Sequence, residues 1–471
     1  MPASPAQSPA PTPTRTPATP AAEVLHARRT LLALYFLTGI AVATWLSRLP
    51  SITRLLDLSS GELGSVLVVG SVGSLAMVLA AGALTNRWGS RRALVVAAVM
   101  FSAANVLVGL GPTIGSVPVL VVGILVSSSS YALSNVPMNL ETVIIERGMG
   151  RSVVPQFHAA FSIGSMTGSL LGALASWAGL PVFAHFLVLS AVTLVIRLAL
   201  VPQAVLPVPT SLARGVGPAA ESRGGVRAAF GAWRERRTLI IGVIVLTGIL
   251  AEGSANNWLT VAVVDGFEQT EAVAAVVLGV FTGSMTVARL LGTRAIDAFG
   301  RVRVLVGSSV SSLVGVLLFA LGPSLATAAL GAVAWGLGAG LVFPIGVAAV
   351  SGDRARMAGR VSVLSTFGST ASIVAPPLLG AAGEVMGIRH ALALIVGGFV
   401  VAIVLARHVE DDAPTTPAGD THGAADVDLA DDVEHAAAVL DLAGDVAGAG
   451  TGTGAVRPAS TPDRLQLEPC R

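Results

Sequence analysis

Twelve long apolar stretches, separated by short polar turns, dominate this sequence. A helix of about 20 apolar residues crosses the roughly 30 Å hydrocarbon core of a bilayer, since it rises about 1.5 Å per residue. Each stretch is therefore long enough to be a membrane-spanning helix. The stretches lie near 31–52, 61–83, 92–111, 117–146, 155–178, 180–202, 239–263, 270–293, 302–322, 324–350, 359–384 and 388–406.

The composition agrees with a protein whose surface faces lipid. Hydrophobic residues make up 53% of the chain and charged residues 12%, whereas an ordinary soluble domain has roughly 25% charged residues. All the basic residues are arginine, and no aromatic-studded basic face is visible, so nucleic acid is not an expected partner. Cys470 is the only cysteine, and we expect no disulfide framework, metal or cofactor.

An internal repeat divides the stretches into two sets of six. The basic turn around Gly89 returns 211 residues later around Gly300. The run Leu-Leu-Gly-Ala at 170–173 returns at 378–381, an offset of 208 residues. Two unrelated features that share nearly one offset indicate a duplicated chain. The sequence therefore predicts an all-α membrane protein with twelve transmembrane helices in two parallel six-helix pseudo-repeats.

Arginine placement predicts the orientation in the membrane. Loops rich in arginine face the cytoplasm, whereas the opposite loops here are nearly bare or acidic. An even number of helices then puts both termini on the cytoplasmic side of a multi-pass protein in the plasma or inner cell membrane. The arginines gather in 28–29, 87–92, 147–151, 214–237, 294–303 and 354–360.

We expect five segments along the chain. Both ends of the sequence have compositions that favour disorder, although part of the acidic tail, near 425–442, is alternatively a short amphipathic helix. The segments are a disordered cytoplasmic tail (1–27), an N-terminal six-helix bundle (28–202), a cytoplasmic linker (203–237), a C-terminal six-helix bundle (238–406) and an acidic disordered cytoplasmic tail (407–471).

The turn between the second and third stretches resembles a signature of the major facilitator superfamily. The runs Ser-Arg-Leu-Pro at 47–50, Met-Asn at 138–139, Phe-His-Ala-Ala-Phe-Ser at 157–162 and Glu-Gly at 252–253 further resemble a YbjJ-like inner-membrane branch of it. The resemblance, over about 30–406, implies two six-helix bundles around a central cavity, with alternating access by rocking. The residues of the signature are Gly82, Leu84, Asn86, Arg87, Gly89 and Arg91, with a degenerate copy at 292–305.

The same resemblance implies that the two turns form a cytoplasmic gate motif. The family usually has an acidic residue where Asn86 stands, and an acid there can face a helix N-terminus and pair with an arginine. Because only the second copy has an acid, Asp297, we expect a weaker latch in the first half; alternatively, Asn86 caps a helix equally well. The expected gate residues are Gly82, Asn86, Arg87, Gly89, Arg91, Asp297, Gly300 and Arg301.

Charged groups inside the membrane need a partner, a wet cavity or neutralisation. Glu252 lies midway along its stretch and shares a helix face with Asn256, which suits a proton carrier or a structural carboxylate. Arg48 is a candidate to hold a solute anion, Glu252 or Asp265, unless it snorkels to the surface. Trp45, on roughly the same face as Arg48, either stacks on a solute ring or belongs to an interfacial belt.

Further polar residues lie within apolar stretches. His158 is a candidate proton shuttle or a packing histidine. Asn135 and Asn139 share a face and are candidates either to bind a polar ligand or to form interhelical hydrogen bonds. Arg289 and Arg197 lie near the expected cytoplasmic ends of their helices, so we expect them to snorkel or to pair within the basic turns.

These observations favour a secondary active transporter that moves a small solute by alternating access, coupled to protons, with uptake and efflux both open. No phosphate-binding loop of the form GxxxxGK[ST] is present, which excludes a self-contained P-loop pump. The alternatives are a membrane sensor or scaffold that uses the acidic tail, and a membrane-embedded enzyme, for which no nucleophile–base pair or metal cluster is visible. We expect a monomer that works in the lipid bilayer without enzymatic activity.

Overall fold

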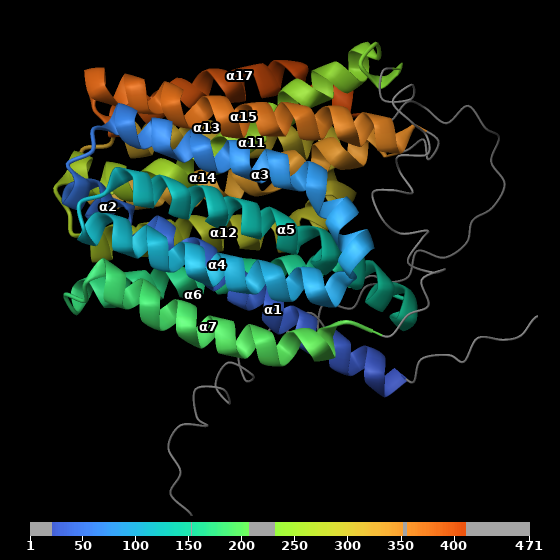
Figure 1. The fold of residues 1–471 in the computed structure, drawn as a ribbon. Coiled ribbons are helices and arrows are strands. Elements are labelled where there is room, and N and C mark those ends of the chain that lie inside the picture. The colour runs from blue at the N-terminus through green and yellow to red at the C-terminus, as the bar shows by residue number, and fades with distance from the viewer. Residues whose placement is uncertain (1–20, 152, 207–230, 352–355, 411–471) are drawn as a thin grey trace, which may run out of the picture. The chain divides into compact units, whose positions relative to one another are not determined.

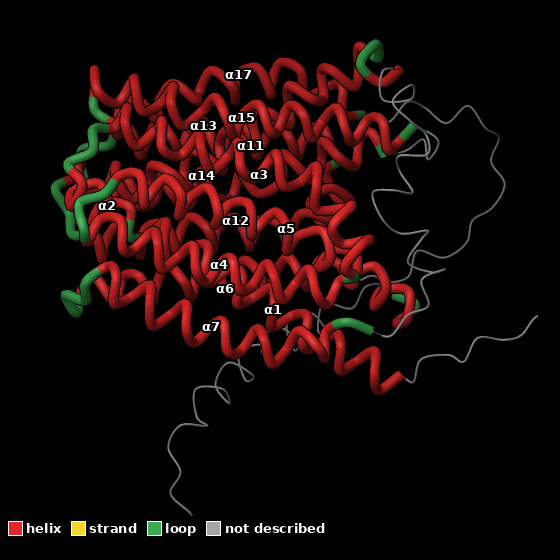
Figure 2. Tube along the Cα trace, in the orientation of Figure 1, coloured by secondary structure: helices red, strands yellow, loops and turns green. Residues whose placement is uncertain are grey.

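The computed structural model describes residues 21–151, 153–206, 231–351 and 356–410. Every regular element in these ranges is helical, as Figure 2 shows. Among them, twelve helices are long and apolar enough to cross a membrane, which confirms the predicted fold class. The expected acidic tail beyond 410, with the stretch at 425–442, and most of the expected linker lie outside the described residues.

The first half of the structure contains one short and six long helices (Figure 1). The helices are α1 (Ala21–Ser47), α2 (Leu49–Leu56), α3 (Ser60–Trp88), α4 (Ser90–Thr113), α5 (Val117–Met149), α6 (Val154–Trp177) and α7 (Val182–Ala204). The second half contains α11 (Arg236–Phe267), α12 (Glu271–Phe299), α13 (Arg301–Leu321), α14 (Leu325–Val350), α15 (Met357–Met386), α16 (Ile388–Ala391), η2 (Leu392–Ile395), α17 (Val396–Leu405) and η3 (Ala406–Val409).

The helices extend beyond the apolar stretches that predict them. The first helix begins at Ala21, inside the segment expected to be a disordered tail. The fifth ends at Met149 instead of near 146, and α11 ends at Phe267 instead of near 263. Hydropathy marks only the part of a helix that lies in hydrocarbon, whereas the backbone hydrogen bonds of the helix continue into residues outside it.

The first expected span, 31–52, is broken in the structure. The helix ends at Ser47, and α2 starts at Leu49 with Arg48 as its N-cap. Pro50 explains the break, because a proline has no N–H to donate four residues back and its ring clashes with that carbonyl in a continuing helix. The break leaves the carbonyl of Leu46 free to accept another donor.

The repeat is visible in the backbone. Gly89 has φ 79° and ψ 155°, and Gly300 has φ 79° and ψ 156°. Asp57 (φ 50°) and Glu268 (φ 52°), the only non-glycine residues with positive φ in the described part of the chain, stand at the same offset of 211 residues. Because positive φ is costly for residues with a Cβ, its recurrence at this spacing shows that the two halves fold alike.

Close helix contacts depend on glycine. In the first half, α1 packs against α6, and a Cβ added to Gly164 or Gly168 would collide with the carbonyl of Phe36 or Ile40. Small residues of this kind let helix backbones approach closely in lipid. The two halves meet mainly where α3 packs against α15 and where α6 packs against α12.

The bundle has two ends that differ in structure. The short helix α2 lies at one end, which we call the α2 end (Figure 1). The turns at Gly89 and Gly300 lie at the opposite end, which we call the turn end, because α3 runs from Ser60, beside α2, to Trp88. The bonds between the halves that we describe below lie at the α2 end.

Candidate functional site

A charged pair lies at the middle of the second half. Oε2 of Glu252, halfway along α11, is 2.9 Å from Nη2 of Arg289 on α12, and the two side chains are 32% and 29% exposed. Nε of Arg289 also donates to the carbonyl oxygen of Gly340 on α14 at 3.4 Å. The expectation that Arg289 snorkels or pairs within a basic turn is therefore wrong. A mid-membrane carboxylate is costly alone, and the arginine compensates for it.

Arg197 does not snorkel either. Its side chain is 6% exposed in the first half, and Nη2 donates to the carbonyl oxygen of Leu37 at 3.0 Å. The guanidinium lies 5.1 Å from the centre of the Phe101 ring. This arginine is buried between α1, α4 and α7, away from the basic turns, so this expectation is also wrong.

Amide and phenol groups of the first half form a connected chain. The hydroxyl of Tyr35 donates to Oδ1 of Asn139 at 3.0 Å, and Nδ2 of Asn139 donates to Oδ1 of Asn135 at 3.3 Å. Tyr131 stands one helical turn before Asn135, on the same face of α5. Tyr35 and Tyr131 are the two tyrosines of the whole sequence; the first bonds to this pair of amides, and the second shares their helix face.

The polar groups of the two halves approach each other through α6 and α12. The helix that contains His158, α6, packs against α12, which contains Arg289, and a Cβ added to Gly283 of α12 would contact Met166 of α6. The ring of His158 lies edge-on to Tyr35, with 6.2 Å between centres. Polar groups of both halves therefore lie on helices that pack against each other. We call this set the central polar face: Tyr35, Tyr131, Asn135, Asn139, His158, Glu252 and Arg289.

Three candidates from the sequence lie in other surroundings. Arg48 does not reach Glu252; its Nε lies 3.3 Å from Oε2 of Glu271 at the α2 end. Trp45 is partly buried and packs against the apolar clusters at that end. Asn256 lies half-buried one helical turn after Glu252, on the same face of α11.

The gate turns lie together at the turn end. Asn86, Arg87, Arg91 and Asp297 are all exposed. The helix that follows the first turn, α4, begins at Gly89 without a side-chain cap, so Asn86 does not cap it in this structure. Gly82 lies inside α3, and Gly300 and Arg301 start α13.

The sequence pattern does not single out Tyr35, Tyr131 or Glu271, and it predicts a different role for Arg289. The rarity of tyrosine could have pointed to Tyr35 and Tyr131, because the sequence of 471 residues has two tyrosines and both lie within membrane stretches. Nothing comparable distinguishes Glu271. Within the described residues, no three His, Cys, Asp or Glu side chains gather in a way that could hold a metal ion.

The sequence resembles those of known transporters. Residues 1–143 and 249–446 match the family model of the Major Facilitator Superfamily. An uncharacterized MFS-type transporter of Yersinia pestis is 28% identical over 350 residues, which cover 74% of this chain and 86% of that protein. An uncharacterized transporter of Sinorhizobium fredii is 28% identical over 381 residues, which cover 80% of this chain and 96% of that protein.

Solved structures of transporters share the fold. The nucleoside transporter NupG matches with a TM-score of 0.67 and 16% identity, over 82% of this chain and 100% of that one. The fucose:proton symporter FucP of E. coli matches with a TM-score of 0.57 and 15% identity, over 83% and 100%. These identities support the fold alone. No comparison names a branch, so the YbjJ-like branch stays a prediction.

Proposed function

The chain belongs to the Major Facilitator Superfamily, and from this premise we propose that it couples the movement of a small polar solute to protons by alternating access. It is a multi-pass membrane transporter and not an enzyme. Neither the sensor nor the enzyme alternative is favoured by its transporter relatives. The observation that supports the proposal is the ion pair between Glu252 and Arg289, whose helix α12 packs against α6 of the other half.

Glu252 is the proposed proton carrier. Its carboxylate is partly exposed at mid-depth, so it can exchange a proton with water that reaches the centre. Protonation removes the charge that compensates Arg289, and an uncompensated arginine at this depth is costly. The protein then favours an arrangement in which the guanidinium finds other acceptors or water. Proton binding is thereby linked to movement at the place where the halves meet.

The proposed solute is neutral and polar. The charges of Glu252 and Arg289 cancel, so the central polar face does not demand a charged solute. The amides of Asn135 and Asn139 and the hydroxyl of Tyr131 offer donors and acceptors, while the ring of Tyr131, which is partly exposed, offers a flat apolar surface. A ring-shaped solute with several hydroxyl groups suits this combination. NupG and FucP, which share the fold, are named for a nucleoside and for fucose.

The proposed orientation follows from the arginine-rich loops. It makes the turn end cytoplasmic, with both termini on that side, and the α2 end external, in the cell membrane. One chain contains both halves and the whole central polar face, so we propose that the monomer is the working unit. The proposal applies to uptake and to efflux, because transport in either direction uses the same two states, one open at the turn end and one open at the α2 end.

The proposal is tested with purified protein in liposomes and a panel of sugars, nucleosides and cyclic polyols. With an imposed pH gradient, we expect the wild type to accumulate at least one of these solutes against its concentration gradient. Glu252→Gln should abolish this accumulation but retain exchange of labelled for unlabelled solute, since exchange needs no net proton movement. Glu268→Gln, which neutralises an exposed carboxylate at the α2 end, is the matched control. Full gradient-driven accumulation by Glu252→Gln would show that Glu252 is not the coupling carboxylate.

A further inference from the structure

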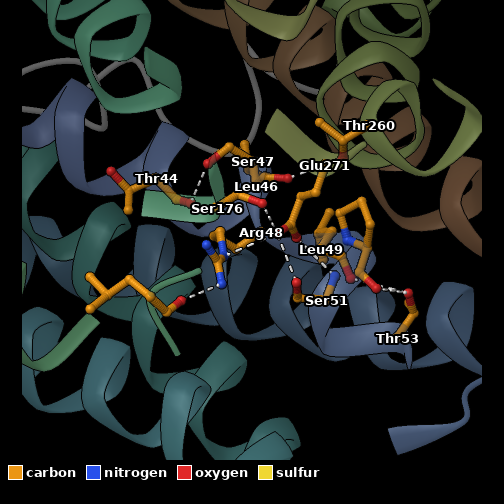
Figure 3. Close-up of polar contacts among 12 residues, drawn as sticks. Thr44, Leu46, Ser47, Arg48, Leu49, Ser51, Thr53, Ser176, Thr260 and Glu271 are labelled. Atoms are coloured by element: carbon orange, nitrogen blue, oxygen red, sulfur yellow. Dashed lines mark hydrogen bonds and ion pairs between the residues drawn. The ribbon is translucent and has the colours of Figure 1, made fainter. Parts of the chain in front are cut away.

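The carboxylate of Glu271, on α12, binds three residues of the other half (Figure 3). Its Oε1 accepts from the backbone N–H of Ser51 at 2.9 Å. Its Oε2 accepts from the hydroxyl of Ser51 at 2.7 Å and from that of Ser176 at 2.8 Å, and forms the ion pair with Arg48 at 3.3 Å. The Arg48 and Glu271 side chains are each 5% exposed. We call these four residues the Glu271 lock.

The Ser-Arg-Leu-Pro run at 47–50 explains why these donors are free. The second residue of α2, Pro50, has no N–H, and the next N–H, that of Ser51, is one of the unpaired donors at the start of the helix. It points at the carboxylate, where the helix dipole also favours negative charge. The carbonyl of Leu46, left free by the same proline, accepts from Oγ1 of Thr260 at 3.2 Å. The break between α1 and α2 thus supplies both a donor and an acceptor to the second half.

A second carboxylate of the second half makes the pseudo-symmetric contact. Glu384, near the end of α15, accepts from the hydroxyl of Ser59 at 2.7 Å and from the N–H of Gly61 at 3.2 Å, at the start of α3. The offset of 208 residues that relates Gly179 to Gly387 also relates Ser176 to Glu384.

The two contacts therefore join equivalent helix ends. In the Glu271 lock, the start of α12 meets the end of α6; in the second contact, the start of α3 meets the end of α15. The carboxylate belongs to the second half in both cases. They differ in burial and charge, because Glu384 is exposed and its described contacts include no arginine.

We propose that the Glu271 lock holds the α2 end shut and that the Glu384 contact is a weaker second latch. Opening this end requires Arg48 and Glu271 to separate and become hydrated. If Glu271 loses its charge, the closed state retains a buried arginine without a counter-charge, whereas in the open state the arginine is in water. Breaking one partner of a buried pair is strongly unfavourable, so the equilibrium moves toward the state that is open at the α2 end.

Spin-label distances test this proposal without any solute, so the result does not depend on the proposed proton coupling. The native cysteine is removed as Cys470→Ser, and labels are attached at Ile114→Cys and Leu321→Cys. Both sites lie at the α2 end, one in each half, and are 57% and 62% exposed. We expect the wild type to show mainly a short distance. Glu271→Gln should raise the ratio of long to short distances by at least about tenfold, whereas Glu384→Gln should change it by about twofold or less.

Two further variants separate gating from misfolding. Ser176→Ala removes one hydrogen bond from Glu271 and should shift the ratio in the same direction by a few-fold, which keeps the proposal testable if Glu271→Gln does not fold. The double variant Arg48→Met with Glu271→Met leaves no buried charge and should return the ratio toward the wild-type value. An unchanged distance distribution in folded Glu271→Gln, or in folded Ser176→Ala, would overturn the proposal. So would a shift by Glu384→Gln as large as that by Glu271→Gln.

Discussion

Arg289 and Arg197 are both arginines within apolar helices, yet their surroundings differ. Arg289 lies 2.9 Å from a carboxylate, that of Glu252. Arg197 donates to the carbonyl of Leu37 and lies over the ring of Phe101, and no carboxylate among the described residues pairs with it. The charge of Arg289 is compensated by an opposite charge. The charge of Arg197 is compensated only by polar groups without charge and by the quadrupole of an aromatic ring.

Arg197 is therefore a residue whose charge contributes little to stability. We predict that Arg197→Met, which keeps most of the side-chain volume, leaves the free energy of unfolding within about 1 kcal/mol of the wild type or raises it, because a buried charge is replaced by an apolar group. Reversible unfolding in mixed micelles measures this. A loss of several kcal/mol would mean that the bonds to α1 outweigh the cost of burying the charge. Phe101→Leu, which removes only the ring contact, serves as the comparison.

At the scale of elements, the tie between α11 and α15 at the turn end depends on one carboxylate. Glu235, the N-cap of α11, accepts from Nε of Arg360 at 2.6 Å and from Oγ1 of Thr238 at 2.9 Å. Burial raises the pKa of Glu235. The hydrogen bonds from Arg360 and Thr238, together with the charges of Arg360 and Arg356, outweigh this effect, so that the pKa of Glu235 lies below its ordinary value of 4.5. The folded state therefore favours the charged form.

This tie should weaken in acid. Because the pKa of Glu235 is lower in the folded than in the unfolded chain, its stabilising effect is complete above about pH 4.5, the ordinary value, and is lost as the pH falls through the folded-state pKa. We predict that the melting temperature of Glu235→Gln is lower than that of the wild type near pH 7 and that the two converge on acidification. Melting curves from pH 3 to 7 measure the difference. A constant gap between the two proteins at every pH would contradict this account.

The twelve membrane spans and their helical structure could be predicted from the sequence, and the breaks within spans and the site only in part. Apolar length determines where a helix lies in lipid, and the offset of 211 residues revealed the repeat. Sequence also places Glu252 and Arg289 at similar depth, because they stand at similar distances from the turn between α11 and α12. Whether they share a face depends on how each helix is rotated, which packing against α14 determines. Arg48 and Ser51 meet Glu271 from another half of the chain, and no local pattern predicts such a contact.

At the scale of the whole molecule, the proposed alternating access requires that each end closes in turn. The α2 end has the Glu271 lock, with its buried ion pair. At the turn end, the gate turns differ in charge: Asn86 is uncharged and Asp297 is acidic, and both are exposed. An acid can pair with arginines or face a helix N-terminus when the end closes, and asparagine supplies no charge. That the second turn, with Asp297, latches this end more strongly than the first turn, with Asn86, therefore stays a prediction.

The prediction is that Asp297→Asn slows transport more than Asn86→Ala does. Removing the one acid of the two turns should destabilise the state that is closed at the turn end, whereas Asn86→Ala removes no charge and no cap of α4. Initial rates of solute exchange in liposomes, normalised to the amount of folded protein, compare the two. Equal rates, or a greater loss with Asn86→Ala, would reverse the assignment.

The uneven placement of charge across the α2 end has a consequence for the open state. Glu271 and Glu384 belong to the second half, and Arg48 belongs to the first. When the halves separate there, the carboxylates of Glu271 and Glu384 stay on one side of the opening and the guanidinium of Arg48 on the other, so we expect an electric field between these groups. We expect this field to turn a solute that has a dipole before the solute reaches Glu252 and Arg289. The residues that close the entrance would then also orient what enters through it.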